Sequence, residues 1–237
     1  MNGREKDDEQ TGRILTRREL VALLGGAGAG ILVADARAGF PQCVGKPEQT
    51  EGPYYLDLKL NRSDIRSDPS DGSAAEGIPL SLEFRVSRIA NQGCTPLAGA
   101  EVDVWHCDAR GIYSGVRDPR FNTTGKKFLR GYQVTDRAGT ARFTTIYPGW
   151  YPGRTVHIHF KIRENTSSGR RSEFTSQLYF DDSVTDQVCA AEPYVRSGRR
   201  MMRNADDFLF RNGGTQLLLA PVKTAEGYSA VFEISLV

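Results

Sequence analysis

Apolar and polar residues alternate along several short stretches of the chain, and this alternation constrains the fold more than any other feature. Leu80, Leu82, Phe84 and Val86 alternate with polar side chains over residues 80–87. A period of two residues is typical of a β-strand with one buried face. Many short strands separated by turns predict an all-β domain, a two-sheet β-sandwich with long loops and few short helices.

The other predicted elements are also short. Strands are expected at 100–105, 155–162, 173–180, 217–222 and 229–237, and a hairpin is expected from 132–135 and 140–146 across the turn 136–139. Only residues 183–190 and 198–210 show a briefly helical pattern. These elements predict a single domain over residues 39–237.

The first 38 residues predict an export signal. Arg17-Arg18 precedes an uncharged stretch, residues 20–34, which is too short and too rich in glycine for a good membrane span. Ala36-Arg37-Ala38 supplies the small-x-small pattern of a cleavage site. Paired arginines before a weakly hydrophobic segment resemble a twin-arginine signal, so we expect export to the periplasm or beyond, without stable membrane insertion after signal removal. An ordinary secretory signal and a frayed amphipathic helix are the alternatives.

The four cysteines, Cys43, Cys94, Cys107 and Cys189, include no C-x-x-C pair, so a zinc ribbon or redox motif is not indicated. In an oxidising compartment they permit up to two disulfides, with three pairings. We favour Cys43 with Cys94, because both lie in turn-rich segments that flank the first predicted strand.

The charge balance argues against two classes of partner. Lys and Arg total 31 and Asp and Glu total 29, which gives a formal net charge of +2. The chain has no arginine-rich helix and no ladder of aromatic and basic residues, so we expect no binding to nucleic acid or to an acidic membrane. A small molecule is the expected partner.

Two of the three histidines, His157 and His159, are two residues apart on a predicted strand. Side chains at this spacing point to the same face, here the face opposite Ile158 and Phe160. The pair therefore predicts two ligands that converge on one metal ion, although surface histidines are the alternative for such a pair taken alone. We interpret the third histidine, His106, as structural.

Five motifs occur in the order that is found in one known superfamily. They are QTEGPY (49–54), the run from TPLAGAEVDVWHCD (95–108) to GIYSG (111–115), FLRGYQVTD (128–136), YPGRTVHIH (151–159) and TSQLYF (175–180). Together they resemble the intradiol ring-cleavage dioxygenases, which include protocatechuate 3,4-dioxygenase and catechol 1,2-dioxygenase. The resemblance spans about residues 43–237. The short segment between Tyr151 and His157, and the lack of a long N-terminal helical region, are similar to a secreted, single-domain branch of the superfamily.

The resemblance implies a metal site. It places the four iron ligands of the superfamily on Tyr113, Tyr151, His157 and His159. Phenolate is a hard, anionic oxygen donor, so two tyrosinates favour Fe(III) over softer or less charged ions.

The resemblance also implies roles for residues around the metal. Arg154 would stabilise negative charge that develops on the substrate ring, and Gln177 on the next strand would belong to the same catalytic group. Tyr151 would leave the metal and take up a substrate proton. Pro53 and Tyr54 would line the substrate pocket. A salt-bridge partner and a solvent-facing strand residue are the alternatives for Arg154 and Gln177.

The implied reaction uses O2 to open a catechol-type aromatic diol between its two hydroxyl-bearing carbons, which yields a muconate-type diacid. One rival is a secreted β-sandwich binding module with an inactive metal site. The other is a zinc hydrolase that uses His157 and His159 with a third ligand from His106 or Asp103. The sequence leaves open which catechol is the substrate and whether the protein is a homo-oligomer.

Overall fold

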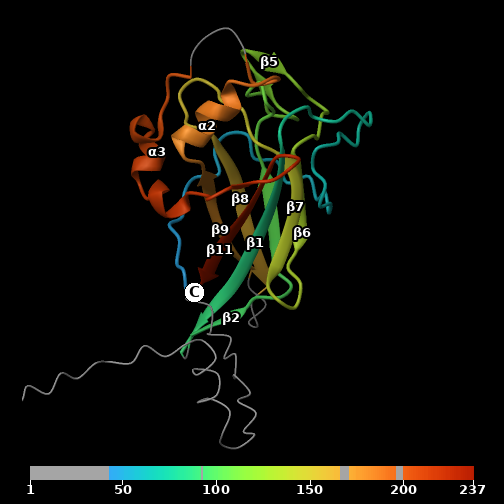
Figure 1. Ribbon diagram of the computed structural model, residues 1–237. Helices are drawn as coiled ribbons and strands as arrows, with labels where there is room; N and C mark the ends of the chain where they lie inside the picture. Colours follow the sequence, from blue (N-terminus) through green and yellow to red (C-terminus); the bar gives the residue numbers. More distant parts are fainter. Residues whose placement is uncertain (1–42, 92, 166–170, 196–199) are drawn as a thin grey trace, which may run out of the picture. The chain divides into compact units, whose positions relative to one another are not determined.

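The domain is a sandwich of two β-sheets (Figure 1). The computed structural model describes residues 43–91, 93–165, 171–195 and 200–237. The two sheets confirm the predicted all-β sandwich. The export signal predicted for residues 1–38 lies outside the described residues and stays a prediction.

One sheet has the strand order β10-β11-β1-β2. The strand β7 also pairs with β1, along a part of β1 that does not pair with β2. The strands of this sheet are β1 (Pro79–Ala90), β2 (Gly93–Pro96), β7 (Thr140–Ile146), β10 (Val222–Lys223) and β11 (Tyr228–Leu236). The first and last long strands of the domain, β1 and β11, run parallel, with Phe84 opposite Phe232. The disulfide between Cys43 and Cys94 ties the start of the described domain to β2, as predicted.

The other sheet has the strand order β6-β3-β8-β9 and is antiparallel throughout. Its strands are β3 (Glu101–Trp105), β6 (Arg130–Val134), β8 (His157–Asn165) and β9 (Arg171–Tyr179). A small hairpin of β4 (Arg117–Asp118) and β5 (Phe121–Asn122) lies outside both sheets. The predicted pairing of 155–162 with 173–180 is confirmed by β8 and β9.

The predicted hairpin of 132–135 with 140–146 is wrong. The two segments form β6 and β7, which belong to different sheets. The turn itself is present, since the Gly139 amide donates to the Asp136 carbonyl at 2.9 Å. A strand–turn–strand pattern looks the same whether the second strand pairs with the first or crosses to the opposite sheet, so the alternation could not distinguish the two.

Helices are few and short. They are α2 (Asp182–Cys189), α3 (Phe208–Arg211) and the 3-10 turns η1 (Asn204–Asp206) and η2 (Gly214–Leu217). The helix predicted at 183–190 is confirmed by α2. The longer one predicted at 198–210 is replaced, over its described part, by η1 and the start of α3. No continuous strand forms at 217–222, where the structure has only an isolated bridge of Leu218 with Tyr179 and, at the end of the segment, the first residue of β10.

The core lies between the sheets, where aromatic rings from both sides meet. Phe84 of β1 packs against Phe160 of β8 and Phe232 of β11, with ring centroids 5.3 and 5.8 Å apart. All three are buried, and burying one such side chain contributes about 1.5–3 kcal/mol. Because of this packing, the face of β8 that carries Phe160 points toward the core.

The opposite face of β8 is buried as well. It carries His157, His159 and Lys161. Lys161 Nζ donates to Glu51 at 2.6 Å and lies 4.3 Å from the centroid of the Tyr55 ring. The segment before β1 therefore covers this face, which places the two histidines in the interior of the protein.

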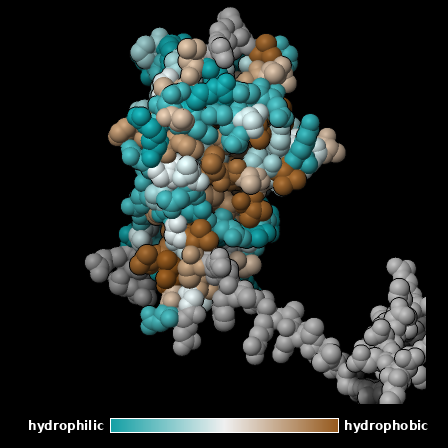
Figure 2. Space-filling model, turned by 60° about the vertical axis from the view of Figure 1, so that its left-hand side comes forward, coloured by the Kyte–Doolittle hydropathy of each residue, from teal (hydrophilic) through white to brown (hydrophobic). Residues whose placement is uncertain are grey.

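The surface is mainly hydrophilic, with small hydrophobic patches on the face that Figure 2 shows. Exposed large hydrophobic residues are Ile89, Val134, Val195, Met201, Phe208, Val222, Val231 and Val237. Scattered apolar side chains of this kind are normal on a protein surface. Over the described residues, no helix has the length and apolar character to cross a bilayer.

Candidate metal centre

The two histidines of β8 meet at the Nε2 atoms of their rings. His157 Nε2 and His159 Nε2 lie 3.0 Å apart, and both side chains are almost completely buried. The period of two along the strand puts them on one face, as predicted. Their neighbour on β3 is Trp105, which stacks on the His159 ring at a centroid distance of 5.1 Å and an angle of 6°.

Two tyrosines from separate loops complete the cluster. The Tyr151 hydroxyl lies 3.1 Å from His157 Nε2, and the Tyr113 hydroxyl lies 3.5 Å from the same atom. The structure thus brings together all four residues that the sequence predicted as metal ligands. We call these four residues the donor cluster.

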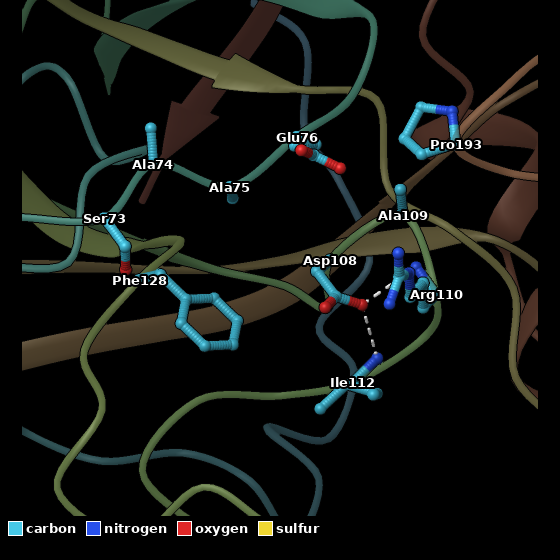
Figure 3. Close-up of a pocket in the computed structure, with 10 residues that line it drawn as sticks. All are labelled: Ser73, Ala74, Ala75, Glu76, Asp108, Ala109, Arg110, Ile112, Phe128 and Pro193. Atoms are coloured by element: carbon cyan, nitrogen blue, oxygen red, sulfur yellow. Dashed lines mark hydrogen bonds between the residues drawn. The ribbon is translucent and has the colours of Figure 1, made fainter.

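A tight turn after β3 presents Tyr113 to the cluster. Asp108 Oδ1 accepts hydrogen bonds from the amides of Arg110 and Ile112, both at 2.9 Å (Figure 3). Gly111 has a φ of +78°, and a Cβ there would lie 2.3 Å from the Trp150 carbonyl oxygen. Only glycine combines this backbone conformation with such a close approach, so the turn can pack directly against the loop that carries Tyr151.

The proton positions of the histidines favour a cation in the cluster. His157 Nδ1 lies 2.7 Å from the Thr155 carbonyl oxygen, which can only accept, so Nδ1 carries the proton and Nε2 a lone pair. His159 Nδ1 is buried without a hydrogen-bond partner among the described residues. If His159 carries its proton on Nδ1, two lone pairs face each other, and if it carries it on Nε2, Nδ1 is a buried acceptor without a donor. A cation bound between the two Nε2 atoms removes this conflict.

Burial sets the protonation of the donor cluster. It lowers the pKa of His157 to about 3 and that of His159 well below its usual value, so both rings are neutral at neutral pH. Burial also raises the pKa of Tyr113 and Tyr151 above 10. Both phenols therefore keep their protons until a strong positive charge is bound beside them.

The chemistry of these donors fits a trivalent, hard ion. Among the described residues no group of three or more His, Cys, Asp or Glu side chains could hold a metal ion, so a set that binds one here has to include tyrosine. Two phenolate oxygens and two neutral imidazoles suit Fe(III). The donor cluster would hold this ion.

Arg154 and Gln177 lie together beside the cluster, as predicted. Arg154 Nη2 donates to Gln177 Oε1 at 2.7 Å, and Gln177 Nε2 donates to the Thr50 carbonyl at 2.9 Å. The positive charge of Arg154 also helps to lower the pKa of His157, after burial. The alternative of a solvent-facing Gln177 is wrong, since this side chain is fully buried.

Two further residues of this network, Asp207 and Tyr179, were not predicted from the sequence. Asp207 Oδ2 accepts from Arg154 Nε at 2.8 Å, and the Tyr179 hydroxyl donates to Gln49 at 2.6 Å. Asp207 stands directly before the short helix α3, so its sequence context suits an N-cap. No sequence signal links it to Arg154, which is 53 positions away.

Pro53 and Tyr54, the two residues predicted to line a substrate pocket, lie in different environments. The Tyr54 ring packs on Tyr113 at a centroid distance of 4.7 Å, and its hydroxyl donates to Asp118 Oδ2 at 2.5 Å. Pro53 follows Gly52, where an added Cβ would come within 3.2 Å of the His159 ring, but Pro53 itself is exposed. Contact with substrate stays a prediction for both.

The candidates for a third zinc ligand are engaged elsewhere. His106 Nδ1 lies 2.7 Å from the Cys107 carbonyl oxygen, and its Nε2 lies 2.7 Å from the Thr145 hydroxyl. This confirms that His106 is structural. Asp103 pairs with Arg163 at 3.2 Å. Neither side chain belongs to the donor cluster.

A hollow of about 390 Å³ lies next to the donor cluster. It is lined by Arg110, Gly111, Ile112, Arg120, Phe121, Trp150, Tyr151 and Pro152. Its volume is in the range of small-molecule sites. Tyr151 belongs both to the hollow and to the cluster, so a ligand in the hollow would lie against a predicted metal ligand. A second hollow of about 310 Å³ shares Arg110 and Ile112 with it (Figure 3).

The sequence profile of a family described as Dioxygenase matches residues 50–214, a range that contains the whole donor cluster. A solved intradiol ring-cleavage dioxygenase from Tetranychus urticae is 32% identical, with a TM-score of 0.70 over 81% of this chain and 94% of that one. This chain belongs to the intradiol ring-cleavage dioxygenase superfamily.

Other members of the superfamily match only in part. The catechol 1,2-dioxygenase of Candida albicans is 33% identical over 47% of this chain and 40% of its own length. The β chain of protocatechuate 3,4-dioxygenase from Burkholderia cepacia is 31% identical over 53% of this chain and 55% of its own length. The chain thus spans about half the length of these relatives.

Proposed function

We propose that this intradiol dioxygenase homologue binds Fe(III) in the donor cluster and uses O2 to cleave a catechol-type diol between its two hydroxyl-bearing carbons. The observation that carries the proposal is the meeting of two phenol oxygens with two imidazole nitrogens. Tyr151, Tyr113 and His159 each place a donor atom within 3.5 Å of His157 Nε2. The muconate-type diacid is the expected product.

When bound, Fe(III) would supply a Lewis acid for the diol and make its ring reactive toward O2. The residues of the chain have distinct tasks around it. Tyr113, His157 and His159 are buried and would hold the ion in place. Tyr151 is less buried and borders the hollow, so its hydroxyl oxygen is the one placed to accept a proton from the incoming diol.

Arg154 would act on the ring itself. Its guanidinium is close enough to the cluster to lower the pKa of His157, and it is held by Gln177. A fixed positive charge at this position stabilises negative charge that develops on the ring. Removing such a group typically costs about 3 kcal/mol of barrier.

The test is the colour, metal content and activity of the purified protein. We expect stoichiometric iron, a red-brown visible band from tyrosinate bound to Fe(III), and O2 uptake with a panel of catechols. Tyr113→Phe and His159→Ala should lose the band and reduce kcat/KM by at least ~10²-fold. Tyr228→Phe is the control, because Tyr228 is a partly buried tyrosine that lies on β11 in the other sheet.

Three outcomes would contradict the proposal. A colourless protein with stoichiometric zinc would exclude the ferric site. A protein that holds iron and shows the band, but takes up no O2 with any catechol, would be a binding module with an inactive site. Full activity in Tyr113→Phe would show that the ligand set is wrong.

We also propose that the chain is exported and that residues 1–38 are the signal. Two observations support this: the paired arginines before a weakly hydrophobic segment, and the disulfide between Cys43 and Cys94, a bond that persists in oxidising compartments. Finding the protein in the cytoplasmic fraction of expressing cells would contradict it.

A further inference from the structure

Arg154 has a long side chain, whose charge has to be held at one defined point if it is to act on the substrate. It lies just before β8, after Gly153, whose φ is +90° and which has no atom within 4 Å of an added Cβ. An arginine with several rotatable bonds has to lose considerable rotamer freedom before its charge can act at one defined point.

Contacts from two directions hold the guanidinium. Nε donates to Asp207 Oδ2 at 2.8 Å, and Nη2 donates to Gln177 Oε1 at 2.7 Å and to the Tyr179 hydroxyl at 3.5 Å. Nη1 makes no hydrogen bond to a described residue. It is the part of the guanidinium that remains for a substrate.

Asp207 is itself held firmly. Its side chain is 1% exposed. Oδ1 accepts from the amides of Leu209 and Phe210 at 2.8 and 3.1 Å and so caps α3. Oδ2 accepts from the Thr155 amide at 2.8 Å as well as from Arg154. The carboxylate thus joins α3 to the start of β8.

Asp207 is also charged. Burial alone would raise its pKa, but the hydrogen bond from the Thr155 amide and the attraction of Arg154 outweigh burial, so the pKa of Asp207 lies below its usual value. It is the only carboxylate within 4 Å of the Arg154 guanidinium in the described part of the chain. A charge-assisted bond of this kind fixes direction as well as distance.

We infer that Asp207 is a positioning residue for Arg154, which holds the guanidinium through Nε so that Nη1 stays available to the reacting ring. This inference rests on the proposed function for the role of Arg154, but the placement of the side chain can be tested without it. Gln177 contributes the second support. The cap on α3 and the support of Arg154 are thus two tasks of one carboxylate, divided between its two oxygens.

The test separates these tasks by a matched pair of substitutions. Asp207→Ser keeps an N-cap residue but cannot reach Arg154. Asp181→Ser makes the same change at the N-cap of α2, where Asp181 is exposed and accepts from Ser183. Asp207→Asn, which keeps the shape and loses the charge, serves if Asp207→Ser does not fold.

We expect kcat of the Asp207 variants to fall by about 10²-fold, the loss typical of a misplaced catalytic group. KM and the visible band should change little, because the donor cluster is intact. In Arg154→Gln the same Asp207 substitution should cause no further loss, since its effect passes through Arg154. Asp181→Ser should behave like the wild type.

Crystal structures of the Asp207 and Asp181 variants give a readout that does not depend on activity. The Arg154 guanidinium should move or lose order only in the Asp207 variant. An unmoved Arg154, a loss of kcat no larger than in Asp181→Ser, or a loss that multiplies with that of Arg154→Gln would overturn the inference. A wild-type protein that cleaves no diol would instead contradict the proposed function, and the crystal structures would still decide the position of Arg154.

Discussion

At the scale of single residues, the two histidines are oriented by different means. His157 is fixed through Nδ1 by the Thr155 carbonyl, the kind of hydrogen bond that usually orients a metal-binding histidine. His159 has no such partner, and its ring instead stacks on Trp105. Tyr55 packs on the same indole at a centroid distance of 4.8 Å. The orientation of His159 thus depends on aromatic packing.

Removing the indole should therefore loosen the metal. We expect Trp105→Leu to weaken iron binding by about 10- to 100-fold, the usual effect of losing the support of a metal ligand. Trp105→Phe keeps a ring and should lose much less. The measurement is the rate and extent of iron release to a chelator, followed by the visible band. Equal iron retention in the two variants would show that stacking does not orient His159.

At the scale of the elements, the chain crosses from one sheet to the other between β6 and β7. Gly139 lies in this crossing with a φ of +73°, and a Cβ there would come within 2.2 Å of the Val86 carbonyl oxygen. Its own carbonyl accepts from the Val86 amide at 2.8 Å. The turn is therefore clamped against β1 at a point where no side chain fits.

Gly139→Ala should destabilise the domain more than a substitution at an open turn. We expect a loss of about 2–4 kcal/mol in the free energy of unfolding, from backbone strain together with the clash against β1. Gly125→Ala is the control, because Gly125 has a φ of +88° but no atom within 4 Å of an added Cβ. That variant should lose only about 1–2 kcal/mol. Urea unfolding of both proteins measures the difference, and similar losses would refute the role of the close approach.

At the scale of the whole domain, the segment before β1 acts as a cover for the donor cluster. Lys161 binds Glu51, Gln177 binds the Thr50 carbonyl, and the Gln49 amide donates to the Thr175 carbonyl at 2.9 Å. This segment begins at the disulfide of Cys43 with Cys94. The bond thus fixes one end of the chain that closes over the buried face of β8.

Loss of the disulfide should lower the free energy of unfolding of the domain. The bond spans 51 positions, for which the chain-entropy relation predicts about 4 kcal/mol. Reduction, or Cys43→Ala with Cys94→Ala, should lower the urea midpoint accordingly. Cys189→Ser, outside the bond, should change it little. Equal midpoints for the oxidised and reduced protein would show that the cover is held by its other contacts.

Local features of the protein could be predicted from the sequence alone. Alternation of apolar and polar residues is a property of neighbouring positions, and it predicted β1, β3, β8 and β9 as strands of a sandwich. The same period placed His157 and His159 on one face. The tyrosines and Arg154 were predicted only through the resemblance to a family, because spacing alone does not show that separate loops meet.

The tertiary structure decided which distant segments lie together. It separated β6 from β7, because strand pairing depends on the whole sheet and not on the turn between two strands. It also brought Asp207 to Arg154, and Trp105 to His159. These contacts depend on how the sheets, loops and the short helix α3 pack. Packing is a property of the complete domain, and for that reason no stretch of the sequence contains it.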